Sequence, residues 1–253
     1  MTRIGPLTVV FALLLVAGLA GCGSSDDESA STLTVFAAAS LKKSFTDISE
    51  QFEADNPGTS VEFNFAGSSD LVTQLAQGAS ADVFASADTN NMVKAEQAEL
   101  VEGRPVDFAS NTLMIVTAPG NPKQVASFAD LIKPGVSVVV CASQVPCGTA
   151  TEEVEQASGT TLNPVSEESS VTDVLNKVTS GQADAGVVYV TDALAAGDKV
   201  ATVDVAESSA AVNTYPIAVL KAAPKPDLAK KFVDLVTGEY GQKVLSEAGF
   251  ARP

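Results

Sequence analysis

The sequence predicts an α/β fold in which most strand pairs are parallel. Short apolar runs with strand character alternate with longer segments whose apolar residues follow helical spacing, and this alternation is typical of α/β proteins. The chain has 253 residues, of which 45% are hydrophobic. That is enough apolar material for one large domain or two small lobes.

The N-terminal half of the folded body alternates strand and helix twice before a third strand. Its first helix, at 41–54, has apolar residues at intervals of 4, 3 and 4, which lie on one helical face. Asn56-Pro57-Gly58 forms a turn after it, and Gly78 ends the second helix. The expected order is strand 33–37, helix 41–54, strand 60–65, a helix opened by 67–70, strand 82–85 and a helix capped by Asp88.

The C-terminal half continues the alternation after a β-prone segment at 111–117, near which we place the first crossing between lobes. Ser169 and Ser170 are expected to cap one helix, and Gly181 to end it. The expected order is strand 136–140, loop 141–148, a helix starting near Thr149, helix 171–179, strand 185–190, strand 214–220 returning to the first lobe, and helices 228–236 and 240–248.

The composition argues against several classes of function. The formal net charge is -16, and nucleic acids and anionic membrane surfaces require basic patches. The sequence contains no histidine, which is the commonest general base and the commonest transition-metal ligand. An anion bound by such an acidic chain must be held by local donors rather than by the overall field.

The N-terminus has the features of a bacterial lipoprotein signal. Arg3 precedes a short apolar run at 9–19, which is too short for a typical transmembrane helix. The run ends in Leu19-Ala20-Gly21-Cys22, a lipobox-like sequence that predicts a signal peptide at 1–21 and a lipid on Cys22. An ordinary signal peptide with an incidental cysteine is the alternative. Residues 22–31 are polar and predict a flexible tether.

Two cysteines remain, Cys141 and Cys147. A signal peptide directs them to an oxidising compartment, and their number is even once Cys22 carries lipid. We therefore predict a disulfide that closes a small loop. Two free buried thiols are the alternative.

Small polar residues recur where a predicted strand ends and a helix begins. The carboxyl ends of strands in an open α/β sheet gather at the edge where ligands bind. Helix N-termini offer unpaired N–H groups and a partial positive charge there, and serine hydroxyls add donors. Several of them together predict an oxyanion site without any lysine or arginine, although a single capping serine is more often only a cap. The residues concerned are Ser40, Ser68 with Ser69, Gly148 with Thr149, and Ser169 with Ser170.

Five segments, in order along residues 32–253, resemble those of the molybdate/tungstate-binding proteins of ABC importers. Together they make the resemblance specific. They are Val35-Phe36-Ala37-Ala38-Ala39-Ser40-Leu41, Phe65-Ala66-Gly67-Ser68-Ser69, the segment Ala-Asp-Val-Phe-Ala-Ser-Ala-Asp at 81–88, Val145-Pro146-Cys147-Gly148, and Gly186-Val187-Val188-Tyr189 with Asp192-Ala193.

The resemblance implies a type II periplasmic-binding-protein fold with the ligand in a cleft between two lobes. Lobe I would comprise 32–111 plus 215–253, and lobe II 112–214. Carried over by position, five residues would bind the oxyanion: Ser40 and Ser68 through hydroxyl and backbone amide, Cys147 and Val171 through their backbone amides, and Tyr189 through its phenol hydroxyl. The chain departs from the family pattern at Cys147, where alanine is usual. Since an amide contact does not depend on the side chain, the role can survive this change.

The function implied is that of an extracytoplasmic lipoprotein, anchored to the cell membrane through Cys22, that passes its ligand to an ABC-transporter permease. The chain would be a monomer and not an enzyme. It would need no cofactor, and molybdenum would be present only as the oxyanion. Molybdate, tungstate and sulfate carry no proton at neutral pH, so a pocket made only of donors fits them all.

Three alternatives stay open at this point. The same fold could bind another ligand such as sulfate, phosphate or ferric iron, although iron sites usually need paired tyrosines. A surface-anchored hydrolase would use Ser40 or Ser68 as nucleophile, but the chain has no histidine to activate it and no Gly-x-Ser-x-Gly motif. A purely structural surface module would bind no oxyanion.

Overall fold

The computed structural model describes residues 31–253. The predicted signal peptide, the predicted lipid-anchor Cys22 and all of the predicted tether except Ser31 lie outside the described residues. Ser31 itself is the first residue of strand β1. Within 31–253, none of the helices has both the length and the apolar character needed to cross a bilayer.

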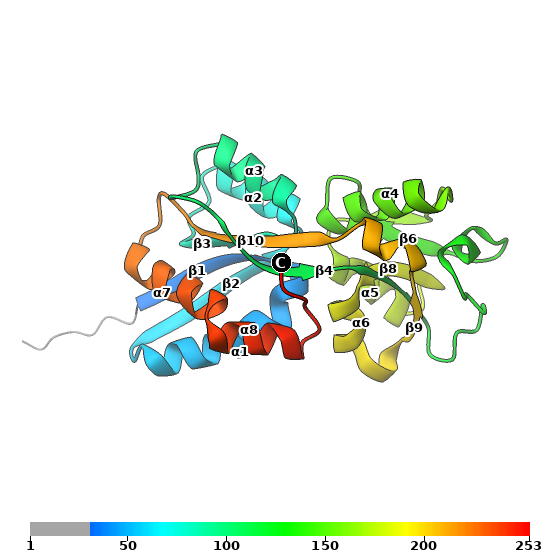
Figure 1. Cartoon of the computed structure of the whole chain (residues 1–253). Helices are drawn as coiled ribbons and strands as arrows, with labels where there is room; N and C mark the ends of the chain where they lie inside the picture. The colour runs from blue at the N-terminus through cyan, green and yellow to red at the C-terminus, as the bar shows by residue number, and fades with distance from the viewer. Residues whose placement is uncertain (1–30) are drawn as a thin grey trace, which may run out of the picture.

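The described chain forms two five-stranded sheets that lie side by side (Figure 1). The first has the order β2-β1-β3-β10-β4, and the second has the order β7-β6-β8-β5-β9. The first sheet contains β1 (Ser31–Ala38), β2 (Thr59–Ala66), β3 (Val83–Ala85), β4 (Val106–Asn111) and β10 (Asn213–Val219). The second contains β5 (Leu113–Thr117), β6 (Val138–Cys141), β7 (Ser166–Glu168), β8 (Ala185–Tyr189) and β9 (Ala201–Asp204).

The α/β fold class predicted from the sequence is confirmed, but the sheets are mixed rather than mostly parallel. In the first sheet β1 pairs in parallel with β2 and β3, while β10 is antiparallel to β3 and β4. In the second, β6 pairs in parallel with β7 and β8, while β5 is antiparallel to β8 and β9. The antiparallel strands β10 and β5 each follow directly on a crossing between the sheets, so they enter their sheet from the opposite end.

Helices cover both faces of the first sheet (Figure 1). On one face, α1 (Lys42–Asp55), α7 (Pro226–Thr237) and α8 (Glu239–Glu247) share a hydrophobic core with the strands. There Phe232 of α7 meets Phe45 and Phe52 of α1 edge-on, with ring centroids 5.8 and 5.4 Å apart. On the other face, α2 (Ser68–Ala76) and α3 (Thr89–Gln97) form a second core. The predicted apolar face of the first helix is thus the face that packs.

The second sheet is covered by α4 (Pro146–Ser158) on one face and by α5 (Val171–Thr179) and α6 (Val190–Ala196) on the other (Figure 1). Its core is made largely of valine and other small apolar side chains. Within residues 31–253 there are also four short 3₁₀ turns: η1 (Ala39–Leu41), η2 (Phe128–Ile132), η3 (Gly197–Lys199) and η4 (Ala206–Ala210).

The chain crosses between the two sheets twice, once from β4 into β5 and once from η4 into β10. We call residues 31–111 and 213–253, around the first sheet, lobe I, and residues 112–212 lobe II. The return strand begins at Asn213, two residues before the expected start of the second part of lobe I. The sequence-based division itself remains a prediction.

Candidate functional site

A small cavity lies between the two lobes, and all five predicted binding residues line it. Its volume is about 10 Å³, far below the roughly 300–1,000 Å³ of pockets that hold drug-sized molecules. A volume of this order is the space of about one water molecule, so the lining residues of the two lobes lie close together. Lobe I contributes Ala38, Ala39, Ser40, Ala66, Gly67, Ser68 and Ala87, and lobe II contributes Val145, Pro146, Cys147, Val171 and Tyr189.

Ser40 lies in η1, directly after strand β1, and is not the helix cap that the sequence suggested. The cap position of α1 is Leu41, and no side chain bonds to the free amides there. The Ser40 hydroxyl instead shares a hydrogen bond of 3.0 Å with the hydroxyl of Tyr215 on β10. A serine hydroxyl offers one donor and two acceptor positions, so Ser40 can accept from Tyr215 and still donate into the cavity.

Ser68 is the first residue of α2, and the cap position belongs to Gly67. Its hydroxyl accepts a hydrogen bond of 3.0 Å from the backbone amide of Ala87, which follows strand β3. The hydroxyl hydrogen of Ser68 is then available as a donor. Ser68 is 1% exposed, so this donor lies inside the protein and not at its surface.

Cys147 lies in the first turn of α4, because the helix begins at Pro146 and not near Thr149 as expected. Proline is favoured at the first position of a helix, where its missing N–H costs nothing. The early start places the Cys147 amide among the helix N–H groups that have no partner within the helix. The Cys147 amide therefore lies at a helix end beside the cavity and not in an irregular loop.

The predicted disulfide between Cys141 and Cys147 is present, with 5.6 Å between the two Cα atoms. It links the end of β6 to the first turn of α4. The enclosed loop is tight, since a Cβ on Gly148 would lie 1.9 Å from the carbonyl oxygen of Ala142. The disulfide and this close approach together fix the segment that presents the Cys147 amide.

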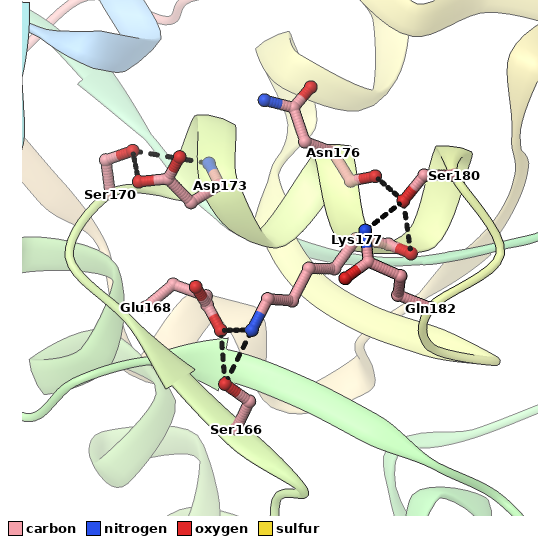
Figure 2. A network of polar contacts seen from close by, with 8 residues as sticks. All are labelled: Ser166, Glu168, Ser170, Asp173, Asn176, Lys177, Ser180 and Gln182. Carbon is pink, nitrogen blue, oxygen red and sulfur yellow. Dashed lines mark hydrogen bonds and ion pairs between the residues drawn. The ribbon is translucent and has the colours of Figure 1, made fainter.

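Val171 is the first residue of α5, as predicted, and Ser170 caps the helix. The amide of Asp173 donates to the Ser170 hydroxyl at 3.2 Å, and that hydroxyl donates to the Asp173 carboxylate at 2.7 Å (Figure 2). The cap satisfies the Asp173 amide and leaves the amide of Val171 at the helix end without a partner inside the helix.

A second group of polar contacts ties α5 to the neighbouring strand β7. Figure 2 shows the Lys177 ammonium between the Glu168 carboxylate and the Ser166 hydroxyl. Burial alone would raise the pKa of Glu168, but the hydrogen bonds from Lys177 and Ser166 outweigh it and hold the pKa below its usual value. This ion pair holds the helix that carries Val171 against the sheet.

Tyr189 ends strand β8 and lines the cavity from lobe II. Its hydroxyl is buried and has no hydrogen-bond partner within residues 31–253. Most buried polar groups are hydrogen-bonded, so an unpartnered one needs an explanation. Burial raises the pKa of the phenol well above its usual value, and Tyr215 adds to the effect. The group is therefore a neutral O–H donor whose position is next to the cavity.

The cavity presents hydrogen-bond donors without formal charge. Of the described residues that line it, none is a lysine, arginine, aspartate or glutamate. Nearby carboxylates serve the helices. Asp88 accepts from the amide of Asn91 at 3.0 Å and caps α3 as predicted, Asp173 bonds to Ser170, and Asp70 is exposed on α2. An anion without a proton matches this arrangement, because it can only accept.

Three further residues that the sequence did not single out for the site lie beside it, and two of them, Asn111 and Asn213, reach across to lobe II. The side-chain amide of Asn111, at the end of β4, donates to the Thr191 hydroxyl of lobe II at 2.8 Å. The Asn213 side chain donates to the Ala87 carbonyl at 2.9 Å and lies 3.5 Å from the Pro146 carbonyl of lobe II. Tyr215 bonds to Ser40 within lobe I, and its ring meets the Tyr189 ring of lobe II edge-on. Their only sequence signal is a polar residue at the end of, or within, an apolar strand.

Residues 33–251 match the family model of the bacterial extracellular solute-binding proteins. The chain belongs to this family. It is 55% identical to the molybdate-binding protein ModA of Mycobacterium tuberculosis, over 100% of both chains. It is also 30% identical to the molybdate-binding protein ModA of Escherichia coli, over 86% of this chain and 88% of that one.

Among solved structures, the periplasmic molybdate-binding protein of Azotobacter vinelandii superposes with a TM-score of 0.76. It covers 87% of this chain and 99% of that one at 21% identity. At that identity the likeness concerns the fold, and it matches the predicted two-lobe periplasmic-binding-protein architecture. As a member of this family, the chain is a solute-binding protein that uses no catalytic cofactor.

Proposed function

We propose that this protein captures molybdate or tungstate outside the cytoplasm and delivers it to the membrane permease of an ABC importer. The observation that carries the proposal is the buried Tyr189 hydroxyl, which has no hydrogen-bond partner among residues 31–253 and lies beside a small cavity lined by Ser40, Ser68, Cys147 and Val171. The molybdate-binding relatives supply the class of oxyanion. The five residues are proposed as the ligands of the ion.

The donor set favours a fully deprotonated tetrahedral dianion. Hydrogen bonds to a charged group are each worth roughly 1.5–3 kcal/mol. Five of them, less the cost of association, correspond to binding free energies of about -8 to -12 kcal/mol, which is micromolar to nanomolar affinity. Hydrogen phosphate carries a proton and calls for an acceptor such as a carboxylate, which is missing from the described lining of the cavity.

Sulfate has the same charge and shape as molybdate, so its rejection must depend on size. A cavity of about 10 Å³ holds its donors close to one another, and close-packed protein interiors resist small changes in volume. Donors spaced for the longer metal–oxygen bonds of molybdate and tungstate contact the smaller sulfate poorly. These two ions are nearly equal in size, and we propose both as ligands.

Capture follows from the two-lobe arrangement. The ion would bind the donors of one lobe first, and closure about the two crossing segments would bring the donors of the other lobe onto it. The closed form would dock as a monomer on the permease.

We propose further that 1–21 is a signal peptide, that the chain is held at the extracytoplasmic face of the membrane by lipid on Cys22, and that 22–31 is its tether.

Thermal unfolding in the presence of different oxyanions tests the proposal. A ligand at 100 times its Kd stabilises the folded state by about 2.7 kcal/mol. With the mature chain, carrying Cys22→Ser so that no lipid is attached, molybdate and tungstate should raise the Tm by several degrees. Sulfate and phosphate at the same concentration should raise it much less. Equal shifts with all four ions, or none with molybdate, would refute the proposal.

The lipid anchor has its own test. Full-length protein expressed in a bacterial host should remain with the membrane fraction, and mass spectrometry of the N-terminal peptide should show acylated Cys22. Cys22→Ser should leave the protein uncleaved or release it. Wild-type protein that stays with the membrane although its Cys22 carries no acyl group would contradict the anchor while leaving ligand binding untouched.

A further inference from the structure

The two lobes come into close backbone contact beside the cavity, at Gly67 of lobe I and Ser169 of lobe II. A Cβ built on Gly67 would lie 2.1 Å from the Ser169 carbonyl oxygen, whereas real Cβ contacts essentially never fall below 3.0 Å. Gly67 has φ -60° and ψ 140°, a conformation that any residue can adopt. The space between the lobes, and not backbone conformation, therefore excludes a side chain at this position.

The contact adjoins one proposed ligand from each lobe. Gly67 directly precedes Ser68, and Ser169 is two residues before Val171. Any change in the separation of Gly67 and Ser169 must also change the separation of the Ser68 hydroxyl and the Val171 amide. The distance across the cavity is thus coupled to how closely these two backbone segments approach.

Hydrogen bonds hold the backbone segments at Gly67 and at Ser169 in place. The Gly67 carbonyl accepts from the amides of Asp70 and Leu71 at 3.0 and 3.1 Å, which fixes it to the first turn of α2. Ser169 lies between the Ser170 cap and Glu168, whose carbonyl accepts from the amide of Ala142 at 2.9 Å. The Glu168 side chain is held by Lys177 (Figure 2).

We infer that Gly67 is a specificity-determining residue, whose contact with the Ser169 carbonyl sets the closed separation of the lobes and with it the size of oxyanion that the site accepts. The inference rests on the proposed function and extends it to a residue that need not touch the ion. A methyl group at position 67 would hold the segments apart by about 1 Å, and hydrogen bonds near 2.9 Å weaken severely when lengthened that far.

Gly67→Ala tests the inference, and Gly238→Ala is its matched control. Gly238 also occupies the cap position of a helix with negative φ, and a Cβ there would lie 2.8 Å from the Asp234 carbonyl, within lobe I alone. Both variants are made in the mature chain with Cys22→Ser. Calorimetry gives the Kd for molybdate and sulfate, and small-angle X-ray scattering gives the compaction on adding molybdate.

We expect Gly67→Ala to raise the molybdate Kd at least tenfold, to raise the sulfate Kd by a larger factor, because sulfate is the smaller ion, and to reduce the compaction. Gly238→Ala should keep the molybdate Kd within twofold of the wild type.

Wild-type affinity and compaction in Gly67→Ala would overturn the inference and leave the proposed function standing. A ligand-free Tm lower than that of Gly238→Ala would also overturn it, because the contact would then belong to the fold itself. A wild-type protein that does not bind molybdate would refute the proposed function instead.

Discussion

The hydroxyl groups of Ser40 and Tyr215 lie 3.0 Å apart, joining η1 to the strand that returns from lobe II. The Tyr215 ring also meets the Tyr189 ring edge-on, with centroids 6.0 Å apart. One of these two buried phenols has a partner and the other has none among the residues described. The two tyrosines therefore differ in role. Tyr215 positions the hydroxyl of Ser40, a proposed ligand, whereas Tyr189 is itself proposed to bind the ion.

Ser40→Ala should weaken molybdate binding by about 10- to 100-fold, since it removes one charge-assisted hydrogen bond worth roughly 1.5–3 kcal/mol. It should also lower the ligand-free Tm, because the Tyr215 hydroxyl loses its partner. Calorimetry and thermal unfolding measure the two effects. Ser180→Ala is a suitable control, because Ser180 is exposed and its hydroxyl makes local bonds. It donates to the Asn176 and Lys177 carbonyls of the preceding helix and accepts from the Gln182 side chain. Unchanged affinity in Ser40→Ala would remove Ser40 from the site.

Tyr189→Phe should change stability and affinity in opposite directions. Removing a buried hydroxyl that has no partner in the described part of the chain relieves a desolvation cost of about 1–3 kcal/mol, so the ligand-free Tm should hold or rise. Molybdate affinity should fall about 10- to 100-fold with the loss of a donor.

Tyr240→Phe, at an exposed position on α8, provides the comparison and should alter neither quantity. A fall in Tyr189→Phe stability without a fall in affinity would mean that the hydroxyl serves the fold, contrary to the account.

The Cys141–Cys147 disulfide should support both stability and binding. In the chain-entropy treatment a loop of this size contributes about 2 kcal/mol to the free energy of unfolding. The double variant Cys141→Ser, Cys147→Ser should lose about that amount in denaturant titrations. Its molybdate Kd should rise severalfold, because the first turn of α4 is no longer held. An unchanged Kd would limit the disulfide to a role in stability.

Asp192 should make stability depend on pH. Burial raises the pKa of this carboxyl from 3.8 to about 7. The folded state then keeps a proton that the unfolded state releases, so the contribution is fully present below about pH 4 and is lost as the pH rises to about 7. The loss can reach about 4 kcal/mol at 1.36 kcal/mol per pH unit.

Asp192→Asn keeps the shape and an acceptor for the Tyr189 amide, which donates to Asp192 at 3.3 Å, but cannot ionise. The free energy of unfolding of the variant, minus that of the wild type, should therefore rise between pH 4 and pH 7. Carboxyls with lowered pKa, such as Glu168 and Asp184, have the opposite dependence and cancel in the difference. Parallel pH curves for the two proteins would contradict the assignment.

Local chemistry made part of the fold predictable. The helix at 171–179 was expected with the bounds that the structure has. Ser170 caps its start, and Gly181 follows soon after its end. The Phe45, Ile48 and Phe52 spacing identified the buried face of α1 in the same way. Proline at position 146 carried the signal for the early start of α4, which the sequence-based placement overlooked.

Long-range contacts were not predictable from local patterns. Strands β4, β7 and β9 were not expected, since they are short or partly exposed and owe their existence to their neighbours in the sheets. Ser40 and Ser68 were expected to cap helices, but they bond to Tyr215 and to the Ala87 amide, far along the chain. The cavity depends on these contacts, and only the family resemblance pointed to the five residues together.

The central claim, that neutral donors from both lobes select a fully deprotonated tetrahedral dianion, is tested most directly by calorimetric titration of the wild-type mature chain with molybdate and with phosphate at pH 7. The account predicts one molybdate bound per chain with a Kd of micromolar or below, and phosphate at least 100-fold weaker. Phosphate binding as tight as molybdate binding, or no heat with molybdate, would contradict it.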